Sequence, residues 1–159
     1  MVLSIMSAVD FTIIPITEHS YDARKFAPLL KKSQSEGYNL VLRLTENWEN
    51  GSNRFDKQGE ALFAAEHENR LLGVGGRSLD PYLEEPGVIR VRHVYVLPEW
   101  RHLGIGNALM KKILDIPQGL FQKVTLRTLN PNARKFYEQL GFEAVGEDAV
   151  THQFILKEK

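Results

Sequence analysis

The chain has 159 residues, of which 43% are hydrophobic and 25% charged, a composition typical of one domain with a sizeable core spanning residues 1–159. Twenty basic residues balance twenty acidic ones, so no net charge attracts the chain to nucleic acid or to an anionic membrane. Because cysteine is absent, disulfides, a thiolate nucleophile and thiolate metal sites are excluded. The five histidines are scattered, without the spacing of paired metal ligands, so we expect no metal site.

The N-terminal segment MVLSIMSAVDF is mildly apolar but lacks the basic start of an export signal, and Ser4, Ser7 and Asp10 interrupt it. No apolar stretch approaches the roughly 20 residues that span a bilayer. The sequence therefore predicts a cytoplasmic protein that binds neither membrane nor nucleic acid.

The first half of the chain predicts a strand at FTIIPI, then a helix within HSYDARKFAPLLKKSQSEGY that stops at Gly37. Residues 45–59 are rich in Asn, Gly and charge, and predict a loop or a short irregular helix. Next, ALFAAEHE and LLGVGGRSL read as a hairpin of two strands joined by Asn69 and Arg70. DPYLEEPG then predicts a turn.

The second half begins with the clearest strand, the β-branched and alternating VIRVRHVYV, which Pro98 ends. A helix follows RHLGIG and runs to about Ile116, and KVTLRTL is another strand. Asn130 is a good N-cap for a short helix that ends at Gly141, and FEAVG and THQFILK are the last strands. This order predicts an α/β fold in which helices cover a central sheet.

The stretch RHLGIG places a turn rich in backbone N–H groups between a strand and a helix. Free amides and the positive end of the helix dipole attract phosphate there, so the turn predicts a pyrophosphate site. Two other phosphate motifs are excluded. No Lys-Ser or Lys-Thr pair follows as in a Walker loop, and Leu109 occupies the third glycine position of a dinucleotide fingerprint.

These residues resemble the GNAT superfamily of N-acetyltransferases. Arg101 to Gly106 match its Q/R-x-x-G-x-G/A signature, and LNPNARKFYEQLGFEAVG resembles a second family signature. The resemblance extends from about Val88 to Gly146. It implies a mixed sheet of about six to seven strands with helices on both faces, splayed between two central parallel strands.

The resemblance also implies acetyl-CoA as cosubstrate and an amine as acceptor, and it leaves the oligomeric state open, a homodimer included. Pantetheine would pair with the backbone near Val94, Tyr95 and Val96. The pyrophosphate would lie on the amides of Arg101, His102, Leu103, Gly104, Ile105, Gly106 and Asn107. The second signature supplies three further cofactor contacts, Asn130, Ala133 and Phe136.

By the same resemblance, Tyr137 lies near the thioester sulfur and is the candidate proton donor to the CoA thiolate. The alternative is a core tyrosine, because Ala133, Phe136, Tyr137 and Leu140 share one helix face.

Strand alternation predicts Arg90, Arg92, Val94 and Val96 on one face, and Ile89, Val91, His93 and Tyr95 on the other. Many relatives carry a carboxylate base at Arg90 or Arg92, whereas this chain has arginine at both positions. His93 could serve as the base if a bulge turns it into the cleft. The alternatives are a histidine satisfied by a backbone hydrogen bond, and a proton path through water to solvent, Glu60 or Glu66.

Arginine forks bind carboxylates and phosphates bidentately, so a cluster of arginines at the cleft predicts an anionic acceptor. The candidate residues are Arg54, Arg77, Arg90 and Arg92. In the alternative, they pair with surface acids such as Asp80, Glu84, Glu85 and Glu99. Two functions remain open: direct transfer of an acetyl group without an acyl-enzyme, and a non-catalytic acyl-CoA-binding module.

Overall fold

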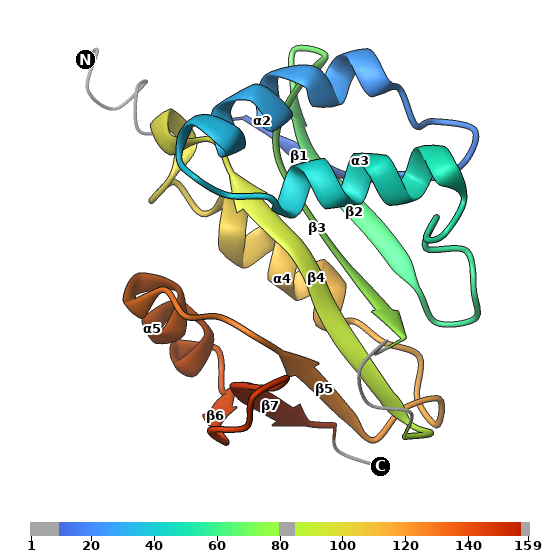
Figure 1. Cartoon of the computed structure of the whole chain (residues 1–159), viewed down its shortest axis with the longest axis vertical. Coiled ribbons are helices and arrows are strands. Elements are labelled where there is room, and N and C mark those ends of the chain that lie inside the picture. Colours follow the sequence, from blue (N-terminus) through green and yellow to red (C-terminus); the bar gives the residue numbers. More distant parts are fainter. Residues whose placement is uncertain (1–9, 80–84, 157–159) are drawn as a thin grey trace.

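Seven strands form one mixed sheet with helices on both faces in the computed structural model, which describes residues 10–79 and 85–156 (Figure 1). The strands are ordered β1-β2-β3-β4-β5-β7-β6. Their bounds are β1 Thr12–Pro15, β2 Ala61–His67, β3 Arg70–Leu79, β4 Val88–Val96, β5 Lys123–Leu126, β6 Glu143–Ala144 and β7 His152–Ile155. The helices are α2 Ala23–Ser35, α3 Leu40–Asn50, α4 Ile105–Leu114 and α5 Pro131–Gln139, with a 3₁₀ turn at Pro98–Trp100. The predicted α/β class and strand number are confirmed.

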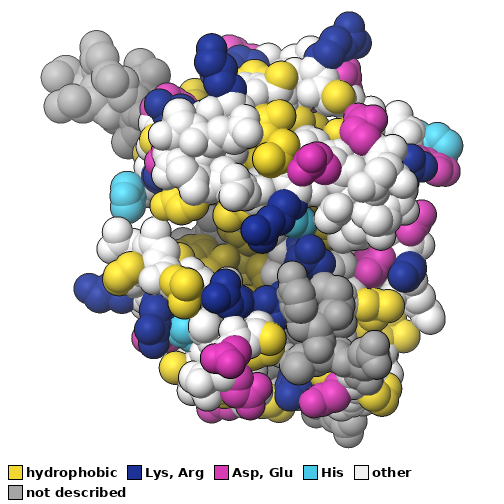
Figure 2. Space-filling view, viewed as in Figure 1, with side chains coloured by type: hydrophobic (Ala, Val, Ile, Leu, Met, Phe, Trp, Pro, Cys, Tyr) yellow, Lys and Arg dark blue, Asp and Glu magenta, His cyan; other side chains and the backbone are white. Residues whose placement is uncertain are grey.

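The centre of the sheet is a parallel pair, β4 and β5, whose hydrogen-bonded register covers only three residue pairs. Pairing ends at Arg90 and Thr125, although β4 continues to Val96. The two strands diverge beyond that point, as predicted (Figure 1). Figure 2 shows a hollow between α5 and the α2–α3 half of the molecule, with apolar side chains on its floor and Lys and Arg side chains along its rim.

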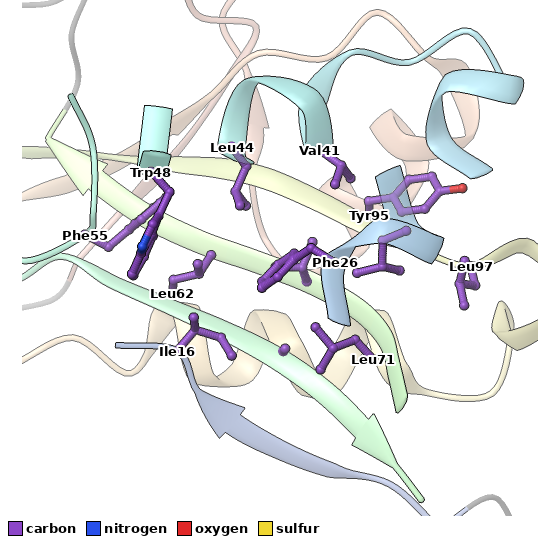
Figure 3. Packing of buried hydrophobic residues seen from close by; sticks show 13 residues of the cluster. Ile16, Phe26, Val41, Leu44, Trp48, Phe55, Leu62, Leu71, Tyr95 and Leu97 are labelled. Atoms are coloured by element: carbon purple, nitrogen blue, oxygen red, sulfur yellow. The ribbon is translucent and has the colours of Figure 1, made fainter. Parts of the chain in front are cut away.

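Two apolar layers hold the helices to the sheet. On one face, α2 and α3 pack Phe26, Leu29, Val41, Leu44 and Trp48 against Tyr95 and Leu97 of the β4 exit (Figure 3). On the other face, Met110 and Ile113 of α4 and Tyr137 of α5 pack against Ile89 and Val91. In the described ranges, no helix is long and apolar enough to cross a membrane.

For residues 45–59 the sequence left a loop or a short irregular helix open, and the structure shows that the first part belongs to a regular α-helix, because α3 extends through Asn50. Val41, Leu44 and Trp48 recur at helical spacing and are buried, so the apolar pattern decided the structure of a segment whose composition suggested a loop. Gly51 ends the helix in a left-handed conformation at φ 81°. Most of the turn predicted at DPYLEEPG lies outside the described residues, as does most of the N-terminal segment.

Arg77 of β3 is buried and holds the C-terminal end of α4 to the sheet. Its Nη1 donates to the carbonyls of Lys112 at 3.1 Å, Ile113 at 2.9 Å and Asp115 at 3.3 Å. Its Nε donates to the Gly59 carbonyl at 2.7 Å. The guanidinium thus donates to carbonyls at the end of α4, where the helix leaves carbonyl groups without i+4 amide partners.

We expect Arg77→Ala to lower the free energy of unfolding by about 3 kcal/mol, because it removes a charged donor from several buried carbonyls. Urea denaturation checks this value. Arg54→Ala is the matched control. Arg54 is exposed and donates to one carbonyl, that of Trp48 at the end of α3. We expect that change to cost about 0.5 kcal/mol. Equal small losses in the two variants would contradict the assigned role of Arg77.

Candidate active site at the opened strand pair

A β-bulge interrupts β4 at His93. Val74 of β3 pairs with Tyr95, but Gly76 pairs with Arg92, so Gly75 faces two residues of β4 instead of one. His93 adopts a positive φ of 57°, which is uncommon for a residue other than glycine. An inserted residue reverses which face each later side chain occupies.

The predicted alternation along β4 is therefore wrong beyond Arg92. Val94 packs with Ile89 and Val91 on the α4 side, whereas Tyr95 packs with the α2–α3 cluster. Arg90 and Arg92 share the α2–α3 face with Tyr95, instead of sharing a face with Val94 and Val96. The bulge, which sequence alone could not locate, places a histidine and two arginines on one side of the opened strand pair.

His93 is half-buried at the bulge, its ring 6.3 Å from that of Phe55 between centroids. Burial is the main cause that lowers its pKa to about 3, and the nearby positive charge of Arg92 adds to this effect. A hydrogen bond with the Leu40 backbone opposes the shift only in part. The Nε2 atom is buried and has no hydrogen-bond partner among the described residues. His93 is therefore a neutral imidazole at neutral pH with one ring nitrogen unsatisfied.

The turn that precedes α4 exposes backbone N–H groups. His102 and Gly104 both have positive φ, 64° and 91°, and α4 begins at Ile105. Gly104 is the N-cap and provides no side-chain hydrogen bond, whereas Asp22 caps α2 and Asn130 caps α5. A Cβ atom at Gly104 would meet no atom within 4 Å, so the turn is open to a ligand. An uncapped helix N-terminus in such a turn is suited to bind an anion.

Helix α5 lies beside this turn. The Oδ1 of Asn130 accepts from the amides of Asn132 at 2.9 Å and Ala133 at 3.3 Å, as the sequence predicted for an N-cap. A Cβ atom on Gly106 would lie 3.3 Å from the ring of Phe136, so a side chain at Gly106 would require that ring to shift by a few tenths of an ångström. The structure thus brings the two halves of the predicted cofactor site, 101–107 and 130–136, into contact.

Tyr137 is buried on the α4–α5 side of the sheet, in edge contact with the rings of Phe136 and Phe142. Burial raises its pKa, so the phenol stays protonated at neutral pH. Tyr137 and His93 therefore face the opened strand pair from opposite sides of the sheet.

The four predicted acceptor-site arginines do not gather in one place. Arg77 and Arg54 hold the ends of α4 and α3, and only Arg90 and Arg92 lie together on the cleft face. Arg90 is buried and donates to the Ala149 carbonyl at 2.8 Å, and Arg92 donates to Ser78 Oγ at 3.1 Å.

Glu60, just before β2, and Glu66, on β2, were considered as ends of a proton path, and both carboxylates have partners in the structure. Glu60 accepts from the amides of Lys57 and Leu79, and Glu66 forms an ion pair with Lys25.

Two residues of the site escaped sequence analysis. Glu36 and Tyr38 flank Gly37, which the sequence identified only as a helix stop. Glu36 binds the side chains of Arg101 and Tyr95, and Tyr38 binds Asn130. Their partners lie 59 to 92 positions away in the sequence, so no local pattern could identify them.

Comparison with known proteins identifies the family to which the chain belongs. Residues 58–144 match the family model described as the acetyltransferase (GNAT) domain. The chain belongs to the GNAT acetyltransferase family. A protein from Exiguobacterium sp. 255-15, provisionally assigned as an acetyltransferase, is 35% identical to this chain. Its crystal structure superposes with a TM-score of 0.79. That match covers 92% of this chain and 94% of the other.

More distant solved structures share the fold. A GNAT-family acetyltransferase from Staphylococcus aureus Mu50 is 16% identical, covers 93% of this chain and 100% of its own, and gives a TM-score of 0.72. Ard1 from Thermoplasma volcanium is 20% identical, with 94% and 100% covered and a TM-score of 0.65. Membership of the GNAT acetyltransferase family supports acyl transfer as the class of reaction. No group of three or more His, Asp or Glu side chains that could hold a metal occurs within residues 10–79 and 85–156.

The neutral imidazole of the half-buried His93 predicts a pH-dependent stability. Between its pKa of about 3 in the folded chain and the ordinary value of 6.5, the unfolded state binds more protons. The contribution of His93 to the free energy of unfolding is therefore fully present above pH 6.5. It is lost as pH falls toward 3, by up to about 1.4 kcal/mol per pH unit. His93→Asn tolerates the positive φ and should show a shallower loss. Urea denaturation from pH 7 to 4 compares the two proteins, and parallel curves would contradict the assigned burial.

Proposed function

We propose that this GNAT acetyltransferase transfers the acetyl group of acetyl-CoA directly to a primary amine. The observation that carries the proposal is the open, amide-lined turn before α4, located at the diverging end of the β4–β5 pair. In a CoA molecule an anionic pyrophosphate lies at one end of an amide-containing arm. The turn before α4 suits the pyrophosphate, and the diverging strand pair next to it suits the arm.

The residues of this chain fit acetyl-CoA at both places. Among the described strands, β4 pairs with no strand on its β5 side beyond Arg90, so the backbone of Val94 to Val96 can pair with pantetheine amides. The amides from Arg101 to Asn107 can receive the pyrophosphate. Asn130, Ala133 and Phe136 form the α5 wall of the same cleft. Acetyl-CoA supplies an activated thioester, and the chain supplies orientation and proton transfer.

Tyr137 is the proposed proton donor to the departing CoA thiolate, because it is the protonated phenol on the α5 side of the opened pair. On the opposite side, the lowered pKa makes His93 a weak base. We therefore propose that water, and not His93, receives the amine proton and passes it to bulk solvent. A direct attack by the amine needs no enzyme-bound acetyl group, and the chain has no cysteine to hold one.

Gly104→Asp should abolish measurable binding of acetyl-CoA. The change adds a carboxylate to the turn that is proposed to hold the pyrophosphate, and like charges repel. The fold should survive, because a Cβ atom there meets no atom within 4 Å, although the positive φ adds some strain. Isothermal titration calorimetry measures the affinity, and circular dichroism confirms the fold. Unchanged affinity in the folded variant would show that the cofactor binds elsewhere.

Tyr137→Phe should keep the affinity for acetyl-CoA and lower kcat by about 100-fold, the usual size of a general-acid contribution. The phenylalanine keeps the edge contacts with Phe136 and Phe142, so packing changes little. Steady-state kinetics separate kcat from KM. A parallel loss of binding and turnover would indicate a packing role, and full activity would indicate that water protonates the thiolate.

A panel of amines, with release of free CoA as the readout, tests the function itself. We expect amino acids to be better acceptors than their amides, because Arg90 and Arg92 create a positive potential on the acceptor side. Arg92→Ala should reduce this preference, and the mass of the protein should not change with acetyl-CoA alone. Binding of acetyl-CoA without CoA release from any amine would favour a non-catalytic acyl-CoA-binding module. A stoichiometric acetyl adduct would contradict direct transfer.

A further inference from the structure

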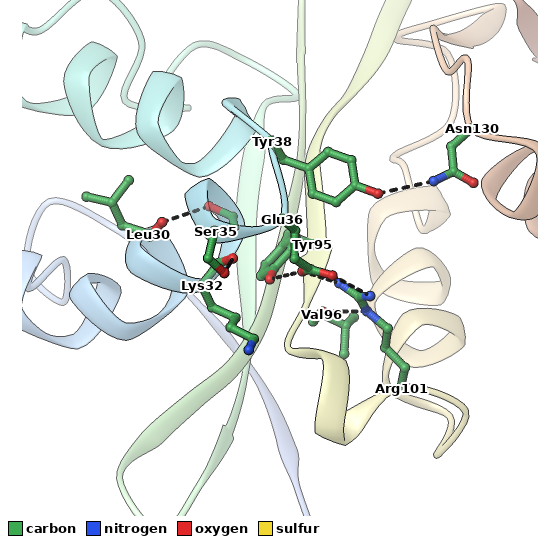
Figure 4. Close-up of polar contacts among 10 residues, drawn as sticks. Leu30, Lys32, Ser35, Glu36, Tyr38, Tyr95, Val96, Arg101 and Asn130 are labelled. Atoms are coloured by element: carbon green, nitrogen blue, oxygen red, sulfur yellow. Dashed lines mark hydrogen bonds and ion pairs between the residues drawn. The ribbon is translucent and has the colours of Figure 1, made fainter.

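Glu36 holds the side chain of Arg101, the first residue of the cofactor turn. Its Oε1 and Oε2 accept from Nη2 and Nη1 of Arg101 at 2.8 and 3.1 Å, a bidentate ion pair (Figure 4). Glu36 Oε1 also accepts from the Tyr95 hydroxyl at 2.5 Å. The bonds to Arg101 are the main cause that lowers the pKa of Glu36, so the carboxylate stays ionised.

Arg101 is fixed on its other sides as well. Its Nε donates to the Val96 carbonyl at 2.9 Å, and its guanidinium lies 5.4 Å from the ring centroid of Tyr95, within range of a cation–π contact. Each nitrogen of the guanidinium therefore donates to a group of β4 or to Glu36 at the end of α2. In this conformation these contacts hold the Arg101 side chain and orient the backbone that begins the turn.

The turn that carries Glu36 is itself rigid. The Tyr38 amide donates to the Ser33 carbonyl at 2.9 Å and the Gly37 amide to the Gln34 carbonyl at 3.0 Å, the pattern of a Schellman motif. Gly37 has φ 86°, which this motif requires and which glycine adopts without strain. Ser33 is fully buried. The side chains of Glu36 and Tyr38 therefore leave the end of α2 from a fixed backbone.

Tyr38 reaches the opposite wall of the cleft. Its hydroxyl accepts a hydrogen bond from Asn130 Nδ2 at 3.2 Å, while Asn130 Oδ1 caps α5 (Figure 4). The Tyr38 ring also lies 6.4 Å from that of Tyr95 in an edge arrangement. One short turn thus contacts the cofactor turn through Glu36 and the start of α5 through Tyr38.

We propose that Glu36 and Tyr38 are positioning residues that set the separation between the cofactor turn and α5, and so align both walls of the acetyl-CoA site. The proposal rests on the proposed function, because it assumes that acetyl-CoA binds between these walls. The diverging strands have no ladder hydrogen bonds between them beyond Arg90 and Thr125 in the described pairings. Side-chain contacts from the α2–α3 turn replace that missing constraint.

The two residues act on different parts of the ligand, and this difference supplies the test. Glu36 orients the turn that receives the pyrophosphate, so Glu36→Gln should weaken binding of acetyl-CoA and of 3′-phospho-ADP, the nucleotide half of CoA, by about tenfold each. Tyr38 orients the start of α5, which supplies none of the turn amides proposed to receive the pyrophosphate and is proposed to border the pantetheine part. Tyr38→Phe should therefore weaken acetyl-CoA by about fivefold and leave 3′-phospho-ADP within about twofold of wild type.

Calorimetric titration of both ligands into wild type, the two variants and Glu46→Gln makes the comparison. Glu46 is an exposed acid on α3, and its substitution should change neither affinity. If Glu36→Gln does not fold, Tyr95→Phe removes a single bond to Glu36 and should weaken both ligands by about threefold.

Unchanged or tighter binding by Glu36→Gln would overturn the proposal, since tighter binding would mean that Glu36 withholds Arg101 from the phosphates. Equal losses for both ligands in Tyr38→Phe would overturn the division between the two walls. A wild type that binds neither ligand would contradict the proposed function and, with it, the positioning roles. A wild type that binds both while the variants match it would contradict the positioning roles alone.

Discussion

The parallel pairing of β4 and β5 stops after Arg90 and Thr125, and the geometry of the site depends on this early stop. A longer ladder would have joined the two strands and left no edge for a ligand. The bulge at His93 lies in the part of β4 that still pairs with β3 but no longer pairs with β5. It reverses the faces that the later side chains of β4 occupy. As a result, Val94 and Val96 pack against α4, whereas Tyr95 and Leu97 pack against α2 and α3.

Charged groups are treated differently in the core and at the cleft. Arg77 is buried, yet it donates to carbonyls at the end of α4, so the helix end provides the partners that burial requires. At the bulge, burial keeps His93 neutral, and the positive charge of Arg92 reinforces this effect. On this face of β4 the positive charge is therefore carried by Arg90 and Arg92, and the adjacent His93 contributes a neutral polar ring.

The N-terminal half and the C-terminal half of the chain meet at the opened strands through few polar contacts. Glu36 joins α2 to the turn before α4, and Tyr38 joins the same turn of α2 to α5. In addition, Phe136 packs directly on Gly106, so α4 and α5 are held together on the far side of the sheet. These contacts occur where β4 and β5 are no longer paired, so side chains from a distant turn join the two halves there.

The sequence by itself determined the elements whose signals are local. The cap at Asn130, the stop at Gly37, the strand from Val88 to Val96 and the two-glycine turn before α4 all depend on neighbouring residues, and each was predictable from them. These signals were sufficient for the fold class. The apolar spacing of Val41, Leu44 and Trp48 was also a local signal for α3, although the polar composition around it suggested a loop.

Only the tertiary structure decided the bulge, the roles of the arginines and the contacts of Glu36. A one-residue insertion in pairing depends on how β3 and β4 align, and the alternating pattern of β4 reads the same with or without it. Likewise, Arg77 and Arg92 look equivalent in the sequence. Arg77 nevertheless donates to the end of α4, whereas Arg92 donates to Ser78 on the neighbouring strand β3. Residue type determined what each side chain could bind, and the packing of distant segments determined which partner it met.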